Sequence, residues 1–225
     1  MTPTARELLE TITGELAPDP GENRLVPLIA RGAADRDTLA ALALEQRWVI
    51  ASDRRSFLHL AQRCADRPEA AAFFTALAGG EELAAERLVA FAAACGVDEA
   101  RAAAHEPLAG CQAYPAYVAW LALNGSPADV VLALHANFAA WGAACATVAG
   151  ALRRHYGLDD EACGFFDFFA GPAPELRRRA AAAVREGLDA GAVGEELARR
   201  HGRLLAAYEA LFWHTLWERD RGQED

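Results

Sequence analysis

The 225-residue sequence predicts an all-α protein, and three observations support that fold class. Roughly a quarter of the residues are alanine, which has the highest intrinsic helix propensity. Clusters of Val, Ile, Thr and Tyr that alternate with polar residues, as strands require, are missing. Helix caps and helix breakers divide the chain into segments of helical length. Because no long linker or repeat of fixed period interrupts these segments, we expect residues 1–225 to form a single-domain helical bundle.

Helix ends are marked at several places along the chain. Asn124-Gly125 ends one helix, and Ser126-Pro127 begins the next with a capping oxygen and a proline at the first helical position. The Gly- and Pro-rich segment 171–174 separates two further helices. The expected helices cover about residues 4–16, 37–65, 69–95, 98–104, 111–124, 127–155, 159–169, 174–190 and 194–218.

Composition and charge exclude several classes of protein. The net charge is −10 and every basic residue is arginine, whereas nucleic-acid binding requires a basic surface. No apolar run reaches the roughly 18 residues of a membrane span, and the N-terminus does not resemble a signal peptide. Five cysteines without a C-x-x-C pair suggest free thiols rather than disulfides or a zinc site. We therefore expect a cytoplasmic protein with no nucleic-acid or membrane partner.

One carboxylate, Glu209, lies in the middle of an apolar stripe near the C-terminus. At helical spacing it shares a face with Phe212, Trp213 and Leu216. An ionised carboxylate is costly among apolar neighbours, so the pKa of Glu209 is expected to rise. A carboxyl group with a raised pKa is suited to general acid or base catalysis near neutral pH. The structural alternative is a salt bridge to a buried arginine such as Arg47.

Three other predicted helices carry polar side chains on an otherwise apolar face. These candidates are Gln46 in 37–65, Tyr114 and Tyr117 in 111–124, and Asn137, beside Trp141, in 127–155. Buried polar groups need hydrogen-bond partners, so these side chains and Glu209 would satisfy one another, or a ligand, if the helices converge. A pocket with aromatic walls and a few polar anchors suits a small heteroaromatic molecule. Structural hydrogen bonds and core tyrosines are the alternative.

Several segments resemble the TenA family, also known as thiaminase II. Glu209, Phe212 and Trp213 have the spacing of the family's closing E-x-x-F-W signature. Residues 113–134 resemble the family's tyrosine-bearing helix, its short turn and the helix that leads to the nucleophile. Residues 165–169 resemble its W-I-D-x-Y motif.

The resemblance implies a heme-oxygenase-like helical fold and an activity in thiamin salvage. Typical members hydrolyse the bond between an aminopyrimidine ring carbon and an amine-type substituent. They use a cysteine nucleophile, a glutamate of the closing signature that moves protons, and an early acidic residue that binds the pyrimidine. Here that glutamate is Glu209, and the early acid aligns with Glu45, Gln46 or Arg47. Because members commonly form homotetramers, we expect a homo-oligomer, either a dimer or a tetramer.

The chain departs from the family pattern at the nucleophile. Asn137 occupies the place of the cysteine, and an amide side chain cannot act as the nucleophile. Cys145 lies about 12 Å further along the helix axis at 1.5 Å per residue, too far to substitute. Phe169 replaces the tyrosine that closes the third motif. A subgroup of the family lacks the cysteine and acts through carboxylates on a formylaminopyrimidine, but this chain also lacks the early acid.

Other members of this superfamily bind two irons through Glu and His ligands. Glu81, Glu82 and Glu86 lie on one predicted helix, but no histidine follows on the same face. His59 or His135 could serve as an axial haem ligand, but nothing marks either of them. Cofactorless oxidases with this fold have sites rich in His, Arg and Lys, unlike the faces described above. We therefore expect neither a metal site nor a cofactor.

These observations predict a TenA-like hydrolase of an aminopyrimidine, a formylaminopyrimidine or a related heterocycle that works without a cysteine nucleophile. Glu209 is expected to be the general acid/base. The side chains expected to bind the substrate are Gln46, Tyr114, Tyr117, Asn137, Trp141 and Phe169. The alternative function is a non-catalytic small-molecule-binding protein on the same fold. An iron-dependent or cofactorless oxidase ranks behind both.

Overall fold

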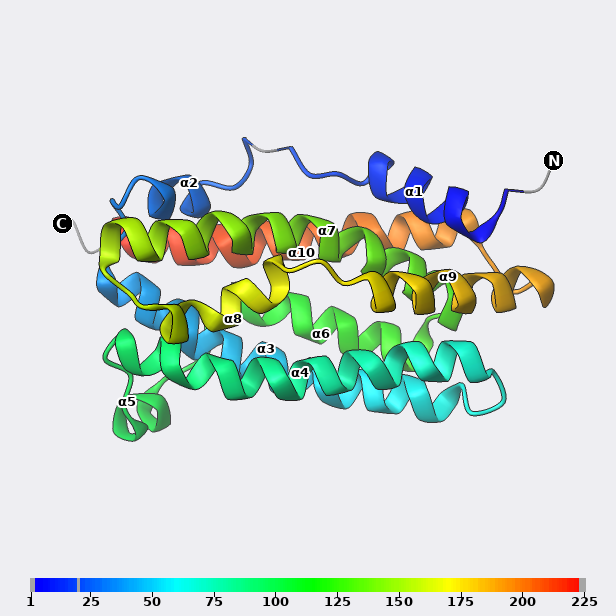
Figure 1. Cartoon of the computed structure of the whole chain (residues 1–225), viewed down its shortest axis with the longest axis horizontal. Helices are drawn as coiled ribbons and strands as arrows, with labels where there is room; N and C mark the ends of the chain where they lie inside the picture. Colours follow the sequence, from blue (N-terminus) through cyan, green and yellow to red (C-terminus); the bar gives the residue numbers. More distant parts are fainter. Residues whose placement is uncertain (1–2, 20, 223–225) are drawn as a thin grey trace.

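The long helices run along a common axis and form an elongated bundle (Figure 1). The computed structural model describes residues 3–19 and 21–222, and no strand occurs in that part of the chain. The helices are α1 (Ala5–Glu15), α2 (Leu25–Ala30), α3 (Arg36–Arg63), α4 (Pro68–Ala94), α5 (Glu99–Ala104), α6 (Ala109–Asn124), α7 (Pro127–Ala151), α8 (Asp160–Ala170), α9 (Pro174–Asp189) and α10 (Glu195–Arg221), with a π-helical segment (Leu152–Tyr156) after α7. The predicted all-α fold class is confirmed.

Helix α7 lies at the centre of the bundle. It packs against α1, α2, α8, α9 and α10. On the other side of the molecule α3 pairs with α4, and α6 packs against both α3 and α10. Figure 1 shows α7 and α10 side by side beneath α1 and α2, and α3 and α4 along the lower edge of the molecule. This arrangement turns faces of α3, α4, α6, α7, α8 and α10 toward the interior.

The apolar core consists of two regions rather than one continuous cluster. One region includes Leu42, Phe91 and Trp213, and the other includes Phe57 and Leu134. The polar side chains on the otherwise apolar faces of the central helices lie where the two regions meet. This arrangement places a small number of polar groups in the middle of an otherwise apolar bundle, where each of them needs a partner.

Polar contacts at the helix ends fix the register of the central helices. Asp129 in the first turn of α7 accepts a hydrogen bond from the backbone N–H of Gly194, which precedes α10 (2.7 Å). Arg63 at the end of α3 donates to the carbonyl oxygens of Ala122 and Gly125 at the end of α6. Side chains one or two turns inside these helices are therefore held in constant positions relative to one another.

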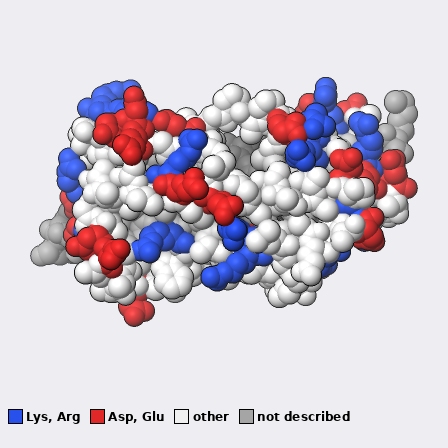
Figure 2. Space-filling view, turned by 60° about the horizontal axis from the view of Figure 1, so that its bottom comes forward, with Lys and Arg blue, Asp and Glu red and all other residues white. Residues whose placement is uncertain are grey.

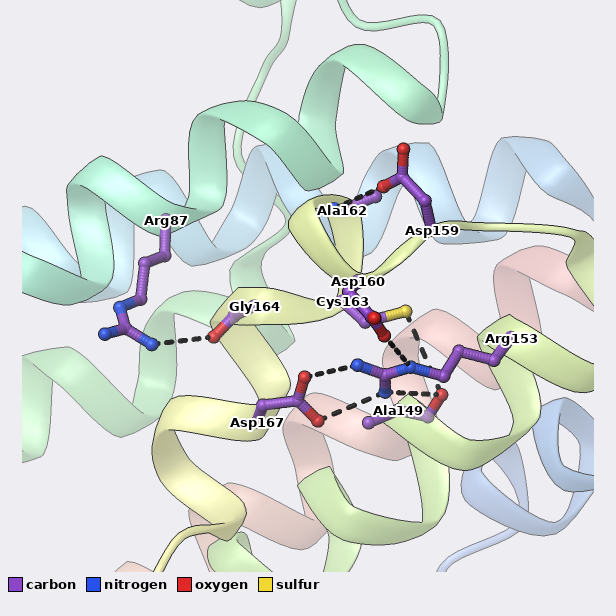
Figure 3. Close-up of polar contacts among 9 residues, drawn as sticks. All are labelled: Arg87, Ala149, Arg153, Asp159, Asp160, Ala162, Cys163, Gly164 and Asp167. Carbon is purple, nitrogen blue, oxygen red and sulfur yellow. Dashed lines mark hydrogen bonds and ion pairs between the residues drawn. The ribbon is translucent and has the colours of Figure 1, made fainter.

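An arginine fastens α8 to the end of α7. Figure 3 shows Arg153, in the π-helical segment, reaching Asp167 and Asp160 of α8. Its two terminal nitrogens contact the two carboxylate oxygens of Asp167 at 3.1 and 2.5 Å. Such a bidentate pair fixes orientation as well as distance. It therefore helps to orient α8, whose Phe169 lies two residues after Asp167.

Two elements differ from the sequence prediction. Helix α2 was not predicted, since it has only six residues, one of them Pro27, and offers no periodic pattern. The predicted helix 127–155 is α-helical only as far as Ala151 and then continues as a π-helix, which ends at Gly157 with a φ of 69°. A left-handed φ of this kind is easily adopted only by glycine.

One helix in the described part of the chain, Pro127–Tyr156, is long and apolar enough to cross a membrane by length and composition. The prediction that no segment has this character is therefore wrong for α7. The apolar composition has another cause, because this helix is the central core helix of the bundle. Its residues from Val130 to Leu134 are all buried against neighbouring helices.

Candidate functional site

A cavity lies in the middle of the bundle, between the two apolar core regions. Its volume is about 60 Å³, which is room for several water molecules at roughly 10–15 Å³ each. Six helices contribute to its wall. The lining residues are Gln46, Val49, Ile50 and Asp53 of α3, Glu81 of α4, Tyr114 of α6, Asn137, Phe138 and Trp141 of α7, Phe169 of α8, and Glu209 and Phe212 of α10. Six of the seven side chains expected from the sequence are among them.

Glu209 is held at the cavity wall by two hydrogen bonds. The indole N–H of Trp213 donates to its Oε1 at 3.2 Å, and the side-chain amide of Asn137 donates to its Oε2 at 2.6 Å. The hydroxyl of Tyr114 in turn donates to Oδ1 of Asn137 at 3.0 Å. A chain of donors thus runs from α6 through α7 to the carboxylate on α10.

Burial raises the pKa of Glu209 to about 7, although its two hydrogen bonds act in the opposite direction. The salt bridge to Arg47 considered above is wrong. Arg47 is exposed to solvent, and no arginine pairs with Glu209 among the ion pairs of the described residues. Glu209 therefore carries a proton that it can give up or take back near neutral pH.

The structure distinguishes between the three residues that align with the family's early acid. Gln46 lines the cavity. Glu45 is fully buried but faces the start of α6, where it accepts hydrogen bonds from Gln112 and from the backbone N–H of Leu108, both at 2.8 Å. Arg47 is exposed. Gln46 is therefore the residue of the three that a ligand in this cavity would contact.

Aromatic rings form one side of the cavity. Trp141 meets the ring of Phe169 edge to face, with centroids 5.8 Å apart, and stacks on Trp213 at 5.4 Å. The Arg153–Asp167 contact shown in Figure 3 lies two residues before Phe169 on α8. Flat apolar walls beside a short row of polar groups suit a small planar ligand.

Tyr117 does not line the cavity, so the expectation that it walls the same pocket is wrong. Its hydroxyl contacts Nδ1 of His201 at 2.9 Å, and its ring stacks on Trp120 with centroids 5.6 Å apart. Tyr114 and Tyr117 are three residues apart, so their side chains diverge by about 60° around the helix axis at 3.6 residues per turn. That divergence directs Tyr114 inward and Tyr117 toward α10.

Two further acidic side chains reach the cavity, Asp53 from α3 and Glu81 from α4. Asp53 lies two helical turns after Gln46 on the same stripe, which is the signal that could have identified it. Glu81 was considered only as an iron ligand. Burial raises the pKa of Asp53 well above its ordinary value. Burial, and then the negative charge of Asp53, raises the pKa of Glu81.

The cysteines lie away from the cavity. Cys145 is completely buried in the apolar core, and burial and the charge of Glu209 raise the pKa of its thiol. A thiol in such surroundings is inert because the thiolate is the reactive form. In the described residues, no group of three or more His, Cys, Asp or Glu side chains could hold a metal ion. The groups available for chemistry are therefore carboxyl, amide and phenol groups.

The fold and the site define a class of protein: a heme-oxygenase-like helical bundle with an acidic, aromatic-walled cavity. The chain belongs to the TENA/THI-4/PQQC family, whose model matches residues 24–217. No curated protein matches the sequence.

Solved structures confirm the heme-oxygenase-like fold. A TenA homologue from P. horikoshii OT3 is 17% identical, with a TM-score of 0.67 over 95% of this chain and 96% of that one. A TenA homologue from Pseudomonas syringae pv. tomato DC3000 is 14% identical, with a TM-score of 0.72 over 96% and 93%. A domain of unknown function with a heme oxygenase-like fold from Shewanella denitrificans OS217 is also 14% identical, with a TM-score of 0.72 over 98% and 93%.

Proposed function

We propose that this protein hydrolyses a carbon–nitrogen bond of an aminopyrimidine, a formylaminopyrimidine or a related single-ring heterocycle, without a covalent cysteine intermediate. One observation carries the proposal. The carboxyl group of Glu209 lies at the wall of the central cavity with a pKa raised to about 7. A group that titrates at the working pH is a far better proton donor and acceptor than an ordinary glutamate.

Glu209 acts as general acid toward the leaving nitrogen. Its protonated form supplies the proton that turns an amide-like or ring-bound nitrogen into a neutral leaving amine. Trp213 and Asn137 hold the carboxyl group in place, so little reorganisation is needed at the moment of transfer. The aromatic wall of Trp141 and Phe169 holds the ring, and Gln46 offers an amide to its polar edge.

Water is the nucleophile in this proposal, because no cysteine lines the cavity. The small volume of the cavity, about 60 Å³, favours compact one-ring substrates. The ionised form of Glu209 can take the proton of the attacking water, so one residue serves both halves of the reaction.

Product analysis of Glu209→Gln tests the proposal. Pyrimidines with amino and formylamino substituents are incubated with the protein, and products are identified by liquid chromatography and mass spectrometry. The variant keeps the side-chain shape but cannot transfer a proton, so turnover should fall by roughly 10²–10⁴ while binding changes little. The control is Glu218→Gln, an exposed glutamate of α10. Equal turnover in wild type and Glu209→Gln contradicts the proposal.

A second candidate function is non-catalytic binding of a small heteroaromatic molecule. It is favoured by the hydrogen bonds of Glu209, since each carboxylate oxygen already accepts one from the protein. Thermal-shift measurements with pyrimidine, thiamin and flavin-like compounds identify ligands, because ligands that bind the native state raise its stability. A ligand that binds tightly and is recovered unchanged supports this function over hydrolysis.

We further propose a cytoplasmic protein that acts on small molecules as a homo-oligomer, either a dimer or a tetramer. Acidic and basic side chains lie interspersed on the face shown in Figure 2, so that face offers no continuous basic surface for nucleic acid. Exposed apolar side chains on α6 and α10, among them Trp120, Leu123 and Leu211, offer a surface for self-association.

A further inference from the structure

The charged groups of the cavity are all acidic. Asp53, Glu81 and Glu209 reach it from three different helices, and the described lining contains no arginine, lysine or histidine. The negative charges of all three carboxylates also raise the pKa of the Tyr114 hydroxyl, after the larger effect of burial. The three acidic side chains therefore act on the same small space.

The protein's own hydrogen-bond donors serve only one of these three groups. Trp213 and Asn137 donate to Glu209, and Tyr114 supports Asn137. Oδ1 of Asp53 has no hydrogen-bond partner, although the side chain is only 4% exposed. No hydrogen bond or ion pair joins Glu81 to any described residue. The donors that form these hydrogen bonds lie on α6, α7 and α10, whereas the two acids without such a donor lie on α3 and α4.

Such an arrangement is costly unless something else satisfies it. A buried carboxyl oxygen without a donor loses its hydration and gains nothing in exchange. Repulsion between Asp53 and Glu81 adds to that cost. Bundles of this kind normally fill such positions with apolar residues, as the cavity itself does with Val49, Ile50 and Phe212. Two acids at this place therefore point to a ligand that brings both donors and positive charge.

We propose that Asp53 and Glu81 form a subsite that binds a protonated amino group of the ligand, while its ring lies against Trp141 and Phe169. This deepens the proposed function and rests on it, because the same cavity holds the same ring. An ammonium group brings up to three donors and one positive charge. It would satisfy Oδ1 of Asp53 and end the repulsion between the two acids, which a neutral or anionic ligand cannot do.

Cation binding at this subsite has a measurable consequence in protons. Burial raises the pKa of both acids, and the negative charge of Asp53 further raises the pKa of Glu81, so the pair without a bound cation holds a proton that the unfolded chain would release. An arriving cation favours the ionised forms and lowers both pKa values. Binding of an amine at neutral pH should therefore release protons, and binding of a neutral isostere should not.

Two matched probes test the subsite directly. Pyrimidin-5-ylmethylamine carries a primary ammonium group, and pyrimidin-5-ylmethanol is its neutral isostere. Titration calorimetry of the full-length protein gives both affinities, and repetition in phosphate and Tris buffers gives the number of protons released. Wild type should bind the amine at least 10-fold more tightly than the alcohol, with proton release only for the amine. Equal affinities, or no amine binding at millimolar concentration, would overturn the proposal.

Three variants locate the effect. Asp53→Asn and Glu81→Gln should each weaken amine binding by roughly 10- to 100-fold and leave alcohol binding unchanged. Glu82→Gln is the control, because this neighbour is exposed and pairs with Arg54 outside the cavity. Thermal midpoints confirm that each variant is folded. An amine preference that survives in both Asp53→Asn and Glu81→Gln would also overturn the subsite.

Glu209→Gln distinguishes failure of the subsite from failure of the hydrolase. If this variant loses turnover while the amine preference is independent of Asp53 and Glu81, the subsite is wrong and the hydrolase stands. If the amine preference depends on the two acids but no product forms with wild type, the subsite stands and the protein is a binding protein.

Discussion

Glu209 and Asp53 are both acidic side chains at one cavity, and they differ in what surrounds them. Glu209 accepts hydrogen bonds from Trp213 and Asn137, so its pKa settles near 7. Oδ1 of Asp53 has no donor, and nothing offsets the rise in pKa that burial causes. At the scale of single residues the site is therefore asymmetric, with one acid ready to exchange protons and another in need of a partner.

The raised pKa of Glu209 predicts a stability that depends on pH. In the unfolded chain the group titrates near its model value of 4.5, and in the folded protein near 7. The folded state thus binds the proton more tightly than the unfolded chain. The stabilising contribution of Glu209 to the free energy of unfolding is therefore complete below about pH 4.5 and is lost as the pH rises through 7. Asp53 and Glu81 act in the same direction.

Urea denaturation measures this effect. The free energy of unfolding of wild type should fall by roughly 1–3 kcal/mol more than that of Glu209→Gln between pH 5 and pH 8. Glu218→Gln, which removes an exposed carboxylate from the same helix, should follow wild type. Parallel pH profiles for wild type and Glu209→Gln would contradict the raised pKa.

Trp213→Phe should shift the titration of Glu209 further upward. The indole N–H donates to Oε1 of the carboxylate and lowers the pKa of Glu209, and phenylalanine has no such donor. The loss of one hydrogen bond to an ionised group should raise the pKa by about one unit. Carbon-13 NMR of labelled glutamate follows the titration without a substrate. Trp217→Phe removes an indole from the same helix and should leave it unchanged.

At the scale of helices, α8 illustrates how a contact outside the cavity shapes it. Arg153 pairs with Asp167, two residues before Phe169, and Phe169 meets Trp141 at the cavity wall. The ion pair is partly exposed, so its direct contribution to stability is modest, and its main effect is on orientation. Loss of this arginine should therefore affect the ligand more than the fold.

Arg153→Gln tests whether this arginine affects ligand binding more than it affects stability. Global stability should fall by about 1 kcal/mol or less, while amide exchange in residues 160–170 should accelerate and ligand affinity should drop several-fold. Hydrogen-exchange mass spectrometry and calorimetry measure the two effects. Arg178→Gln is the control, because it breaks a similarly short ion pair, with Glu175, on the surface of α9. Unchanged exchange in α8 would show that the pair does not hold that helix.

The sequence predicted where the helices lie better than it predicted which side chains of each helix face the interior. Alanine content and capping residues located every long helix, whereas α2 and the π-helical segment offer no periodic signal. Tyr114 and Tyr117 were grouped because they share an apolar helix, but only the packing of α6 against α10 decides which of them faces inward. Glu81 could not be placed beside Asp53, since that neighbourhood depends on how α3 and α4 pair.

At the scale of the whole molecule, the exposed apolar residues are unevenly arranged. Trp120 and Leu123 are exposed on α6, and Leu204 and Leu211 are exposed on α10, the helix against which α6 packs. We call these four residues the α6–α10 surface. Leu123 is 64% exposed, which leaves a large apolar side chain in water if the protein is a monomer. Burial against another copy would remove these side chains from water, so the surface supports the proposed homo-oligomer.

Light scattering after gel filtration tests the α6–α10 surface. Wild type should elute as a dimer or tetramer at micromolar concentration, and Leu123→Glu and Leu211→Glu should shift it toward the monomer. A charge in a desolvated interface is strongly unfavourable, whereas the same charge on a free monomer surface is nearly neutral. Val89→Glu is the matched control, since Val89 is 68% exposed but lies on α4, away from this surface. A monomeric wild type, or variants that remain fully assembled, would contradict self-association through these two helices.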